Sequence, residues 1–191
     1  MRWLLATVLV LVAAGCGGAG SLGHDSNRAK GEIQAAKQFQ SFPLYWAGEQ
    51  FESWPVSDIL LPPNEGEFAT IVYGDCTPTG GDEPSCDPPI ALQIMPLCRH
   101  LRVVAGTPSW RRRQVRGAPV GTNLDGAPVL FSARVQVKVY RGEGTRPGLE
   151  LRVLRALRSL NSVPPLLAPS GPIPAPSRKV LAGSEACRVG R

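Results

Sequence analysis

Histidine is nearly absent from this chain of 191 residues, which contains only two, His24 and His100. The common short catalytic patterns are missing as well: there is no Gly-x-Ser-x-Gly, no His-Glu-x-x-His, no phosphate-binding glycine-rich loop and no Cys-x-x-Cys. A nucleophilic centre assisted by histidine would have to use His100, which stands two positions after Cys98. We therefore expect a protein that is not an enzyme and that needs no cofactor and no metal ion.

Lysine is also scarce, because 17 of the 21 basic residues are arginine. The charges divide along the chain: residues 40–98 contain nine acidic and no basic residues, whereas residues 99–191 contain 17 basic and four acidic ones. Within one compact domain, two such halves can complement each other on the surface, and we favour this interpretation over one large anion-binding face.

A basic run beside Trp110 is the strongest local signal for binding. Anionic lipid headgroups or cell-wall polymers attract such runs, since each basic residue near an anionic surface adds about 1 kcal/mol. The candidate anion-binding residues are Arg111, Arg112, Arg113 and Arg116. The first residues of the chain predict export, as described below, and an exported protein meets little nucleic acid, so we expect no nucleic-acid partner.

The chain begins with Met1-Arg2, followed by the uncharged and mostly apolar stretch Trp3–Ala14. A charged start, about a dozen apolar residues and small residues at the end are typical of a signal peptide, which is too short to span a membrane. Ala13-Ala14-Gly15-Cys16 resembles the lipobox of bacterial lipoproteins, which predicts cleavage after residue 15 and a lipid on Cys16. An ordinary secretory signal is the alternative. Both interpretations predict export, and the first adds a lipid anchor at the extracytoplasmic face of the cell membrane.

Cysteine usage agrees with export, because disulfides persist outside the cytoplasm. If Cys16 carries a lipid, four cysteines remain, which allow three pairings. We favour Cys76–Cys86, which would close a short loop, together with Cys98–Cys187, which would tie the tail to the domain. The even number that remains supports lipidation of Cys16.

Apolar periodicity predicts an α+β fold, with a small, mostly antiparallel sheet, one packed C-terminal helix, disulfide staples and a proline-rich tail. Strands are expected at 42–48, 68–73, 90–95, 101–105 and 129–141, and helices at 28–39 and 149–160. A tight hairpin is expected at Asp125-Gly126. The predicted organisation is a signal peptide at 1–15, a lipid-attached flexible tether at 16–41, a single domain at 42–161 and a proline-rich tail at 162–191.

Two clusters have a structural and a functional interpretation. Six of the twelve aromatic residues lie within positions 39–54, and we expect them to form the core rather than a platform for sugar rings. Acidic residues also gather about the loop between Cys76 and Cys86, where we expect a solvated loop rather than a calcium site. They are Asp75, Asp82, Glu83 and Asp87.

Four short segments form a recognisable set: Tyr45-Trp46-Ala47-Gly48, Tyr73-Gly74-Asp75-Cys76, the run CDPPIALQI that begins at Cys86, and Pro96-Leu97-Cys98. Together they resemble an uncharacterised family of exported proteins from high-GC actinobacteria. The resemblance extends from about Phe42 to about Asn161 and implies export, but no activity and no binding residue. Cys187 lies outside the matched pattern, so Cys98 could instead pair with Cys86 or Cys76.

These observations favour a lipid-anchored envelope protein whose domain is a non-catalytic binding or interaction module at the membrane surface. The expected partner is the membrane itself, through Cys16, with anionic lipid or wall polymer as candidate ligands; no protein partner is indicated. One alternative is an extracytoplasmic enzyme of unfamiliar design that uses the acidic loop and His100. A second alternative is a purely structural envelope component.

Overall fold

The computed structural model describes residues 26–63, 67–75, 77–79, 85–98, 113–123 and 125–181. Its helices are α1 (Ser26–Gln38), α3 (Leu149–Ala156) and α4 (Arg178–Leu181). Its strands are β1 (Tyr45–Trp46), β2 (Gln50–Phe51), β3 (Trp54–Leu60), β4 (Ala69–Tyr73), β5 (Thr77–Thr79), β6 (Ser85–Asp87), β7 (Ile90–Pro96), β8 (Gln114–Val115), β9 (Ala118–Thr122), β10 (Pro128–Phe131), β11 (Val135–Arg141) and β12 (Arg158–Ser159).

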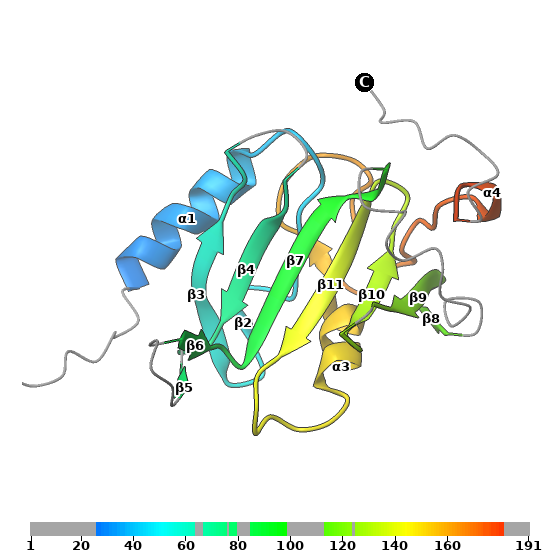
Figure 1. The fold of residues 1–191 in the computed structure, drawn as a ribbon. Helices are drawn as coiled ribbons and strands as arrows, with labels where there is room; N and C mark the ends of the chain where they lie inside the picture. The colour runs from blue at the N-terminus through cyan, green and yellow to red at the C-terminus, as the bar shows by residue number, and fades with distance from the viewer. Residues whose placement is uncertain are drawn as a thin grey trace, which may run out of the picture.

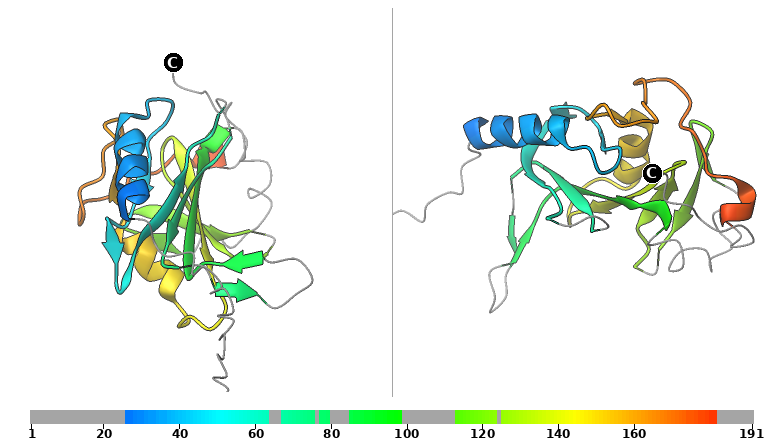
Figure 2. Two further views of the ribbon diagram at one scale, coloured as in Figure 1. Left: turned by 90° about the vertical axis from the view of Figure 1, so that its left-hand side faces the viewer. Right: turned by 90° about the horizontal axis from the view of Figure 1, so that it is seen from above.

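Eight strands form one antiparallel sheet in the order β2-β3-β4-β7-β11-β10-β9-β8 (Figure 1). Two further ladders, β1-β12 and β5-β6, each have two strands. Seen from above, α1, α3 and the segment after α3 lie on one side of the sheet (Figure 2). The expected α+β fold with a mostly antiparallel sheet is therefore confirmed.

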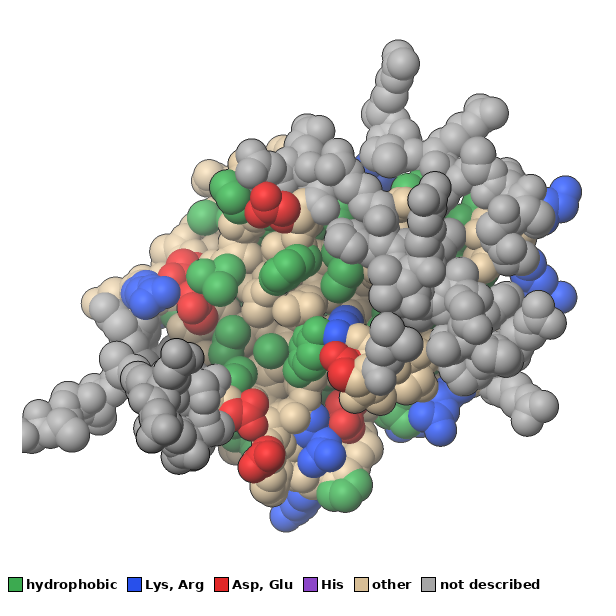
Figure 3. All heavy atoms as spheres, in the orientation of Figure 1, with side chains coloured by type: hydrophobic (Ala, Val, Ile, Leu, Met, Phe, Trp, Pro, Cys, Tyr) green, Lys and Arg blue, Asp and Glu red, His purple; other side chains and the backbone are tan. Residues whose placement is uncertain are grey.

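Alternating side chains give the central strands their two faces. In β4, Ala69, Ile71 and Tyr73 are buried beneath the helices, while the residues between them are half-buried on the opposite face. The same alternation in β7 turns its branched apolar residues toward the same core. In β11 the valines face this core, but Gln136 and Lys138 between them are buried as well. Figure 3 views the opposite face, where hydrophobic and uncharged side chains lie between acidic and basic ones.

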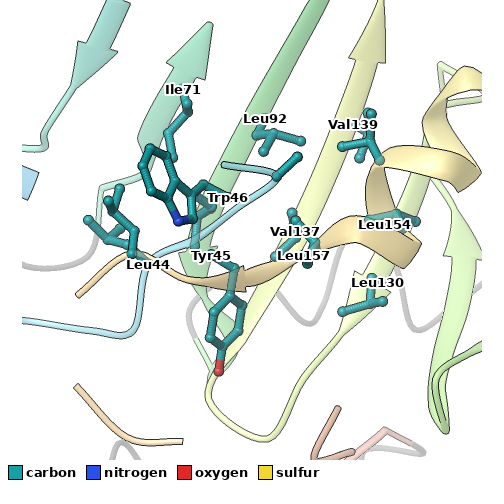
Figure 4. Close-up of a cluster of buried hydrophobic side chains, with 14 of the residues drawn as sticks. Leu44, Tyr45, Trp46, Ile71, Leu92, Leu130, Val137, Val139, Leu154 and Leu157 are labelled. Carbon is teal, nitrogen blue, oxygen red and sulfur yellow. The ribbon is translucent and has the colours of Figure 1, made fainter. Parts of the chain in front are cut away.

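The core joins the sheet to segments that are far apart in the chain. Figure 4 shows side chains from the segment before β1, from the central strands and from α3 meeting in one cluster. Tyr45 lies at the edge of this cluster, and its hydroxyl donates to the Pro165 carbonyl at 2.9 Å. Burial raises the pKa of Tyr45 to about 12. The aromatic residues around β1 thus belong mainly to the core, as expected.

The segment 129–141, expected as one strand, is a hairpin of β10 and β11. Ser132 makes the turn: its hydroxyl donates to the Val135 carbonyl at 2.9 Å and accepts from the Val135 amide at 3.2 Å. A serine hydroxyl can satisfy the backbone of a tight turn without glycine or proline. Apolar residues continue to alternate through the turn, at Val129, Phe131, Ala133 and Val135, and for that reason the single-strand prediction was wrong.

The first expected strand, at 42–48, shortens to β1, which pairs with β12 rather than with the main sheet. Asn161 holds this segment in place from the other end of the chain. Its side-chain oxygen accepts from the Leu44 amide at 2.9 Å, and its nitrogen donates to the carbonyls of Phe39 and Phe42 at 2.8 and 2.9 Å. One buried amide therefore satisfies three backbone groups 117 to 122 positions away.

Helix α1 covers the edge of the sheet beside β3. Glu32 accepts a hydrogen bond from the Ile59 amide at 2.8 Å, and Arg28 bridges Glu32 at 2.7 Å and Asp58 at 3.0 Å. Burial alone would raise the pKa of Glu32, but the hydrogen bonds from Arg28 and Ile59 outweigh it and leave that pKa below its ordinary value. The prediction of a tether at 16–41 is therefore wrong for its second half, because α1 is packed structure.

Helix α3 ends at Ala156, earlier than the expected residue 160, because Leu157 is extended and leads into β12. The chain beyond it stays in contact with the domain. Buried apolar side chains continue into the expected tail at Val163, Leu167, Ile173 and Leu181. Leu181 packs with Leu97, Val129 and Phe131 on the face of the sheet opposite α3. The proline-rich segment is thus part of the packed structure at least as far as Leu181.

A candidate binding groove

A surface groove of about 430 Å³ lies where the turn between β2 and β3 meets the loop between β11 and α3. Both segments lie at the lower end of the molecule in Figure 1. The lining residues are Glu52, Ser53, Trp54, Gly144, Thr145, Arg146 and Arg152. The groove therefore combines one carboxylate, two guanidinium groups, two hydroxyls and one aromatic ring.

Glu52 and Ser53 form a two-residue turn, since Phe51 and Trp54 are paired across the β2-β3 ladder. The backbone of Glu52 has a φ of 52°, in the left-handed region that residues other than glycine rarely adopt. Its carboxylate pairs with Arg152 of α3, with 2.8 Å between Oε1 and Nε. This ion pair connects the two walls of the groove across 100 positions of sequence.

The loop between β11 and α3 is held by the end of β6 and by the two prolines that lead from it into β7. The Gly142 amide donates to the Pro89 carbonyl at 3.1 Å, and the Glu143 amide donates to Asp87 at 2.7 Å. A Cβ atom at Gly142 would lie 2.5 Å from the Pro88 carbonyl oxygen, so this close approach requires glycine. The loop that supplies Gly144, Thr145 and Arg146 to the groove is consequently anchored at its first two residues.

Arg146 is the second cation that lines the groove. Its neighbour Arg141 is engaged, donating to Glu150 at 2.9 Å and to the Thr145 carbonyl at 2.8 Å. Within the described part of the chain, the exposed Arg146 side chain has no hydrogen bond and no ion pair. The groove thus holds one paired and one unpaired guanidinium.

Trp54 forms an apolar wall of the groove and is itself half-buried. It packs closely on Gly74, where a Cβ atom would lie 2.6 Å from Cδ1 of the indole. One side of the ring therefore belongs to the packed structure, while another part contributes to the groove.

A second polar group lies on the face of the sheet opposite the helices. Lys138 pairs with Asp125 at 2.7 Å and lies over the Tyr140 ring at 4.1 Å, while the Tyr140 hydroxyl donates to Gln93 at 3.1 Å. Burial lowers the pKa of Lys138, but Asp125 and Tyr140 outweigh it and leave that pKa above its ordinary value. The neighbouring Gln136 is buried, and its side-chain oxygen has no hydrogen-bond partner among the described residues. Apart from that oxygen, the polar groups of this cluster are paired with one another, so we regard the groove as the stronger candidate for a binding site.

Arg116, predicted as a candidate anion-binding residue, is instead bound to the protein itself. Together with Gly117 it forms the two-residue turn between β8 and β9, with φ values of 50° and 86°. Its guanidinium donates to four carbonyls, and burial lowers its pKa. The four carbonyls belong to Gly171, Arg155, Leu157 and Ala168. Four of its five N–H groups are thereby occupied, so Arg116 is not available to an anion.

The other predicted site residues are described only in part. Arg113 is exposed on the chain that enters β8, and Cys86 lies in β6 opposite Pro78. Cys98 is disulfide-bonded. The remaining predicted residues lie outside the described residues: Cys16, Cys76, Cys187, Arg111 and Arg112, together with the acidic-loop residues Asp82 and Glu83 and with His100.

Sequence reasoning missed the groove because its charged pair lies 100 positions apart and no local motif marks either half.

Among the described residues, no helix is long and apolar enough to cross a membrane, and no group of three metal-ligating side chains occurs. Comparison with protein-family models, curated proteins and solved structures finds no match to this chain.

Proposed function

We propose that the chain is exported, processed before Cys16 and held by a lipid on that residue at the extracytoplasmic face of the membrane, where its domain is a non-catalytic binding module. The signal-like start and the resemblance to exported actinobacterial proteins support this location. The described structure begins at Ser26. The ten chain steps from Cys16 span at most about 35 Å when extended, which would keep the domain close to the membrane.

The observation that carries the binding role is the unpaired guanidinium of Arg146 in the groove. A guanidinium only donates hydrogen bonds and stays charged, so an unpaired one in a concave site suits a ligand that brings acceptor oxygens. The Glu52 carboxylate is already paired with Arg152. The groove is therefore better suited to holding a charged group than to transferring a proton.

We also propose the disulfides Cys98–Cys187 and Cys76–Cys86. Leu97, next to Cys98, packs with Leu181, which stands six positions before Cys187. Cys86 lies in β6 before the start of β7, whereas Cys98 follows its end, and Figure 1 shows these at opposite ends of the strand. The seven residues of β7 rise about 20 Å, whereas a disulfide joins Cα atoms less than about 7 Å apart. This separation disfavours pairing of Cys98 with Cys86.

Intact mass of the chain purified from its native membrane tests the location. We expect a mass that begins at Cys16 and includes a diacylglyceryl group, with four cysteines becoming alkylatable only after reduction. Peptide mapping without reduction should join the peptides of Cys98 and Cys187. A mass without lipid would limit the proposal to export, and a peptide joining Cys98 to Cys86 would refute the proposed pairing.

Sedimentation with cell-envelope fragments tests the binding role. The protein used lacks residues 1–15 and carries Cys16→Ala, changes that leave every described residue in place. We expect saturable sedimentation that falls several-fold with Arg146→Glu. It should also fall at raised salt, because salt screens the attraction between exposed charges and the screening length is already about 8 Å at physiological ionic strength. Arg155→Glu, an exposed charge outside the groove lining, serves as the control. Sedimentation that is absent, or that Arg146→Glu does not change, would argue for a purely structural component.

A further inference from the structure

We propose that the groove takes a phosphate group, bound between Arg146 and Arg152, and that Glu52 occupies the position of this anion when no ligand is bound. The inference rests on the binding role proposed above and adds the chemical class of the ligand. In this arrangement the carboxylate of Glu52 is a resident counter-ion of Arg152, and the incoming phosphate displaces it.

The exposure of the ion pair makes this exchange feasible. The side chains of Glu52 and Arg152 are each 40% exposed. An exposed pair of this kind contributes only about 0–1 kcal/mol to stability, since water solvates both charges well. A doubly charged ligand that binds Arg152 and Arg146 together gains more than the single pair loses.

The backbone of Glu52 provides an independent observation. It is the first central residue of its two-residue turn and has a φ of 52°, at a position where glycine is preferred. A residue with a side chain at this position costs about 1 kcal/mol or more, comparable to or greater than the contribution of its exposed ion pair. Backbone strain that is not compensated by stabilising contacts of the same residue is characteristic of functional sites.

The remaining groups favour phosphate. Two guanidinium groups offer paired N–H donors that match the geometry of phosphate oxygens, and a phosphate can carry two negative charges where a carboxylate carries one. The exposed Ser53 hydroxyl, which has no hydrogen bond among the described residues, is a further donor at the rim. Trp54 supplies an apolar wall for the organic group that bears the phosphate.

Titration with inorganic phosphate tests the assignment. The arginine Nε–Hε signals of the Cys16→Ala chain are followed by NMR, with chloride at matched ionic strength as reference. We expect saturable shifts in which Arg146→Gln weakens the affinity about tenfold, as the loss of one charge-assisted contact implies. Glu52→Gln should tighten binding several-fold because the competing carboxylate is removed, and Arg155→Gln should leave the affinity unchanged.

Two soluble ligands then distinguish the source of the phosphate. Tighter binding of short-chain phosphatidylglycerol than of glycerol 3-phosphate assigns a lipid headgroup, and the reverse order assigns a phosphate of a wall polymer. Absence of saturable shifts, or an equal loss in Arg146→Gln and Arg155→Gln, would overturn the phosphate assignment. Envelope sedimentation can still succeed in that case, so failure of the phosphate assignment is separable from failure of the binding role.

Discussion

Replacement of Arg116 by methionine is expected to lower the free energy of unfolding by about 3 kcal/mol. The guanidinium satisfies four carbonyls from α3, its C-terminal end and the segment that follows. Methionine keeps most of the side-chain volume but leaves those acceptors to water or without a partner. Some of them are exposed, so the loss is smaller than the sum of four charge-assisted hydrogen bonds. Urea unfolding followed by circular dichroism measures the difference.

Two further variants at Arg116 separate its side chain from its backbone. Arg116→Lys keeps the charge but loses the planar fork, and we expect it to lose most of the same stability. Arg116→Gly should be more stable than Arg116→Met by about 1 kcal/mol, because glycine adopts the φ of 50° without strain. A change below about 0.5 kcal/mol in Arg116→Met would mean that the four contacts contribute nothing net.

Asn161→Ala is expected to destabilise the protein by a similar amount, about 3 kcal/mol, since it removes the partners of three buried or part-buried backbone groups. No other described side chain bonds the Leu44 amide, which is buried with its residue. The thermal midpoint should therefore fall by roughly 5–10 °C, given how stability changes scale in a domain of this size.

Asn161→Asp distinguishes hydrogen bonding from packing, because it keeps the shape but loses both N–H donors and introduces a buried charge. Burial raises the pKa of such a carboxyl, so the protonated form is favoured in the folded state. The destabilisation should accordingly shrink as the pH falls below that raised pKa. The exposed neighbour Ser162, changed to alanine, should stay within about 0.5 kcal/mol of the parent. Equal loss in Ser162→Ala and Asn161→Ala would contradict the assigned role.

The sequence correctly predicted those helices, strands and turns whose sequence pattern lies within their own residues. The strands expected at 68–73 and 90–95 were confirmed as β4 and β7. Each is a run of branched apolar residues bounded by glycine, proline or aspartate, so its signal is local. Asp125 and Gly126 do lie in a turn, with Gly126 at a φ of 83°, but the connection between Thr122 and Pro128 is longer than the expected tight hairpin. Helix α3 was expected from its apolar periodicity, and its buried residues are Leu149, Val153 and Leu154.

Long-range contacts account for most of what the sequence did not predict. Arg116 stood in a basic run, and nothing near it in the chain indicates that carbonyls 39 to 55 positions away would bind it. The groove likewise depends on a pair of residues 100 positions apart. Val163, Leu167 and Ile173 are spaced by prolines without helical or strand periodicity, so their burial could not be expected from pattern alone. The export, lipidation and pairing predictions remain predictions.

The bond from the Ile59 amide to Glu32 bears on how copies of the protein would behave when crowded. If the chain is anchored as proposed above, its copies diffuse in two dimensions, where neighbours meet often and an open strand edge can template intermolecular β-pairing and aggregation. Helix α1 occupies this edge with a charged side chain, and the strands at the two ends of the sheet, β2 and β8, have only two residues each. Within the described residues, the main sheet thereby offers little edge for a second copy to extend, which disfavours aggregation through edge pairing.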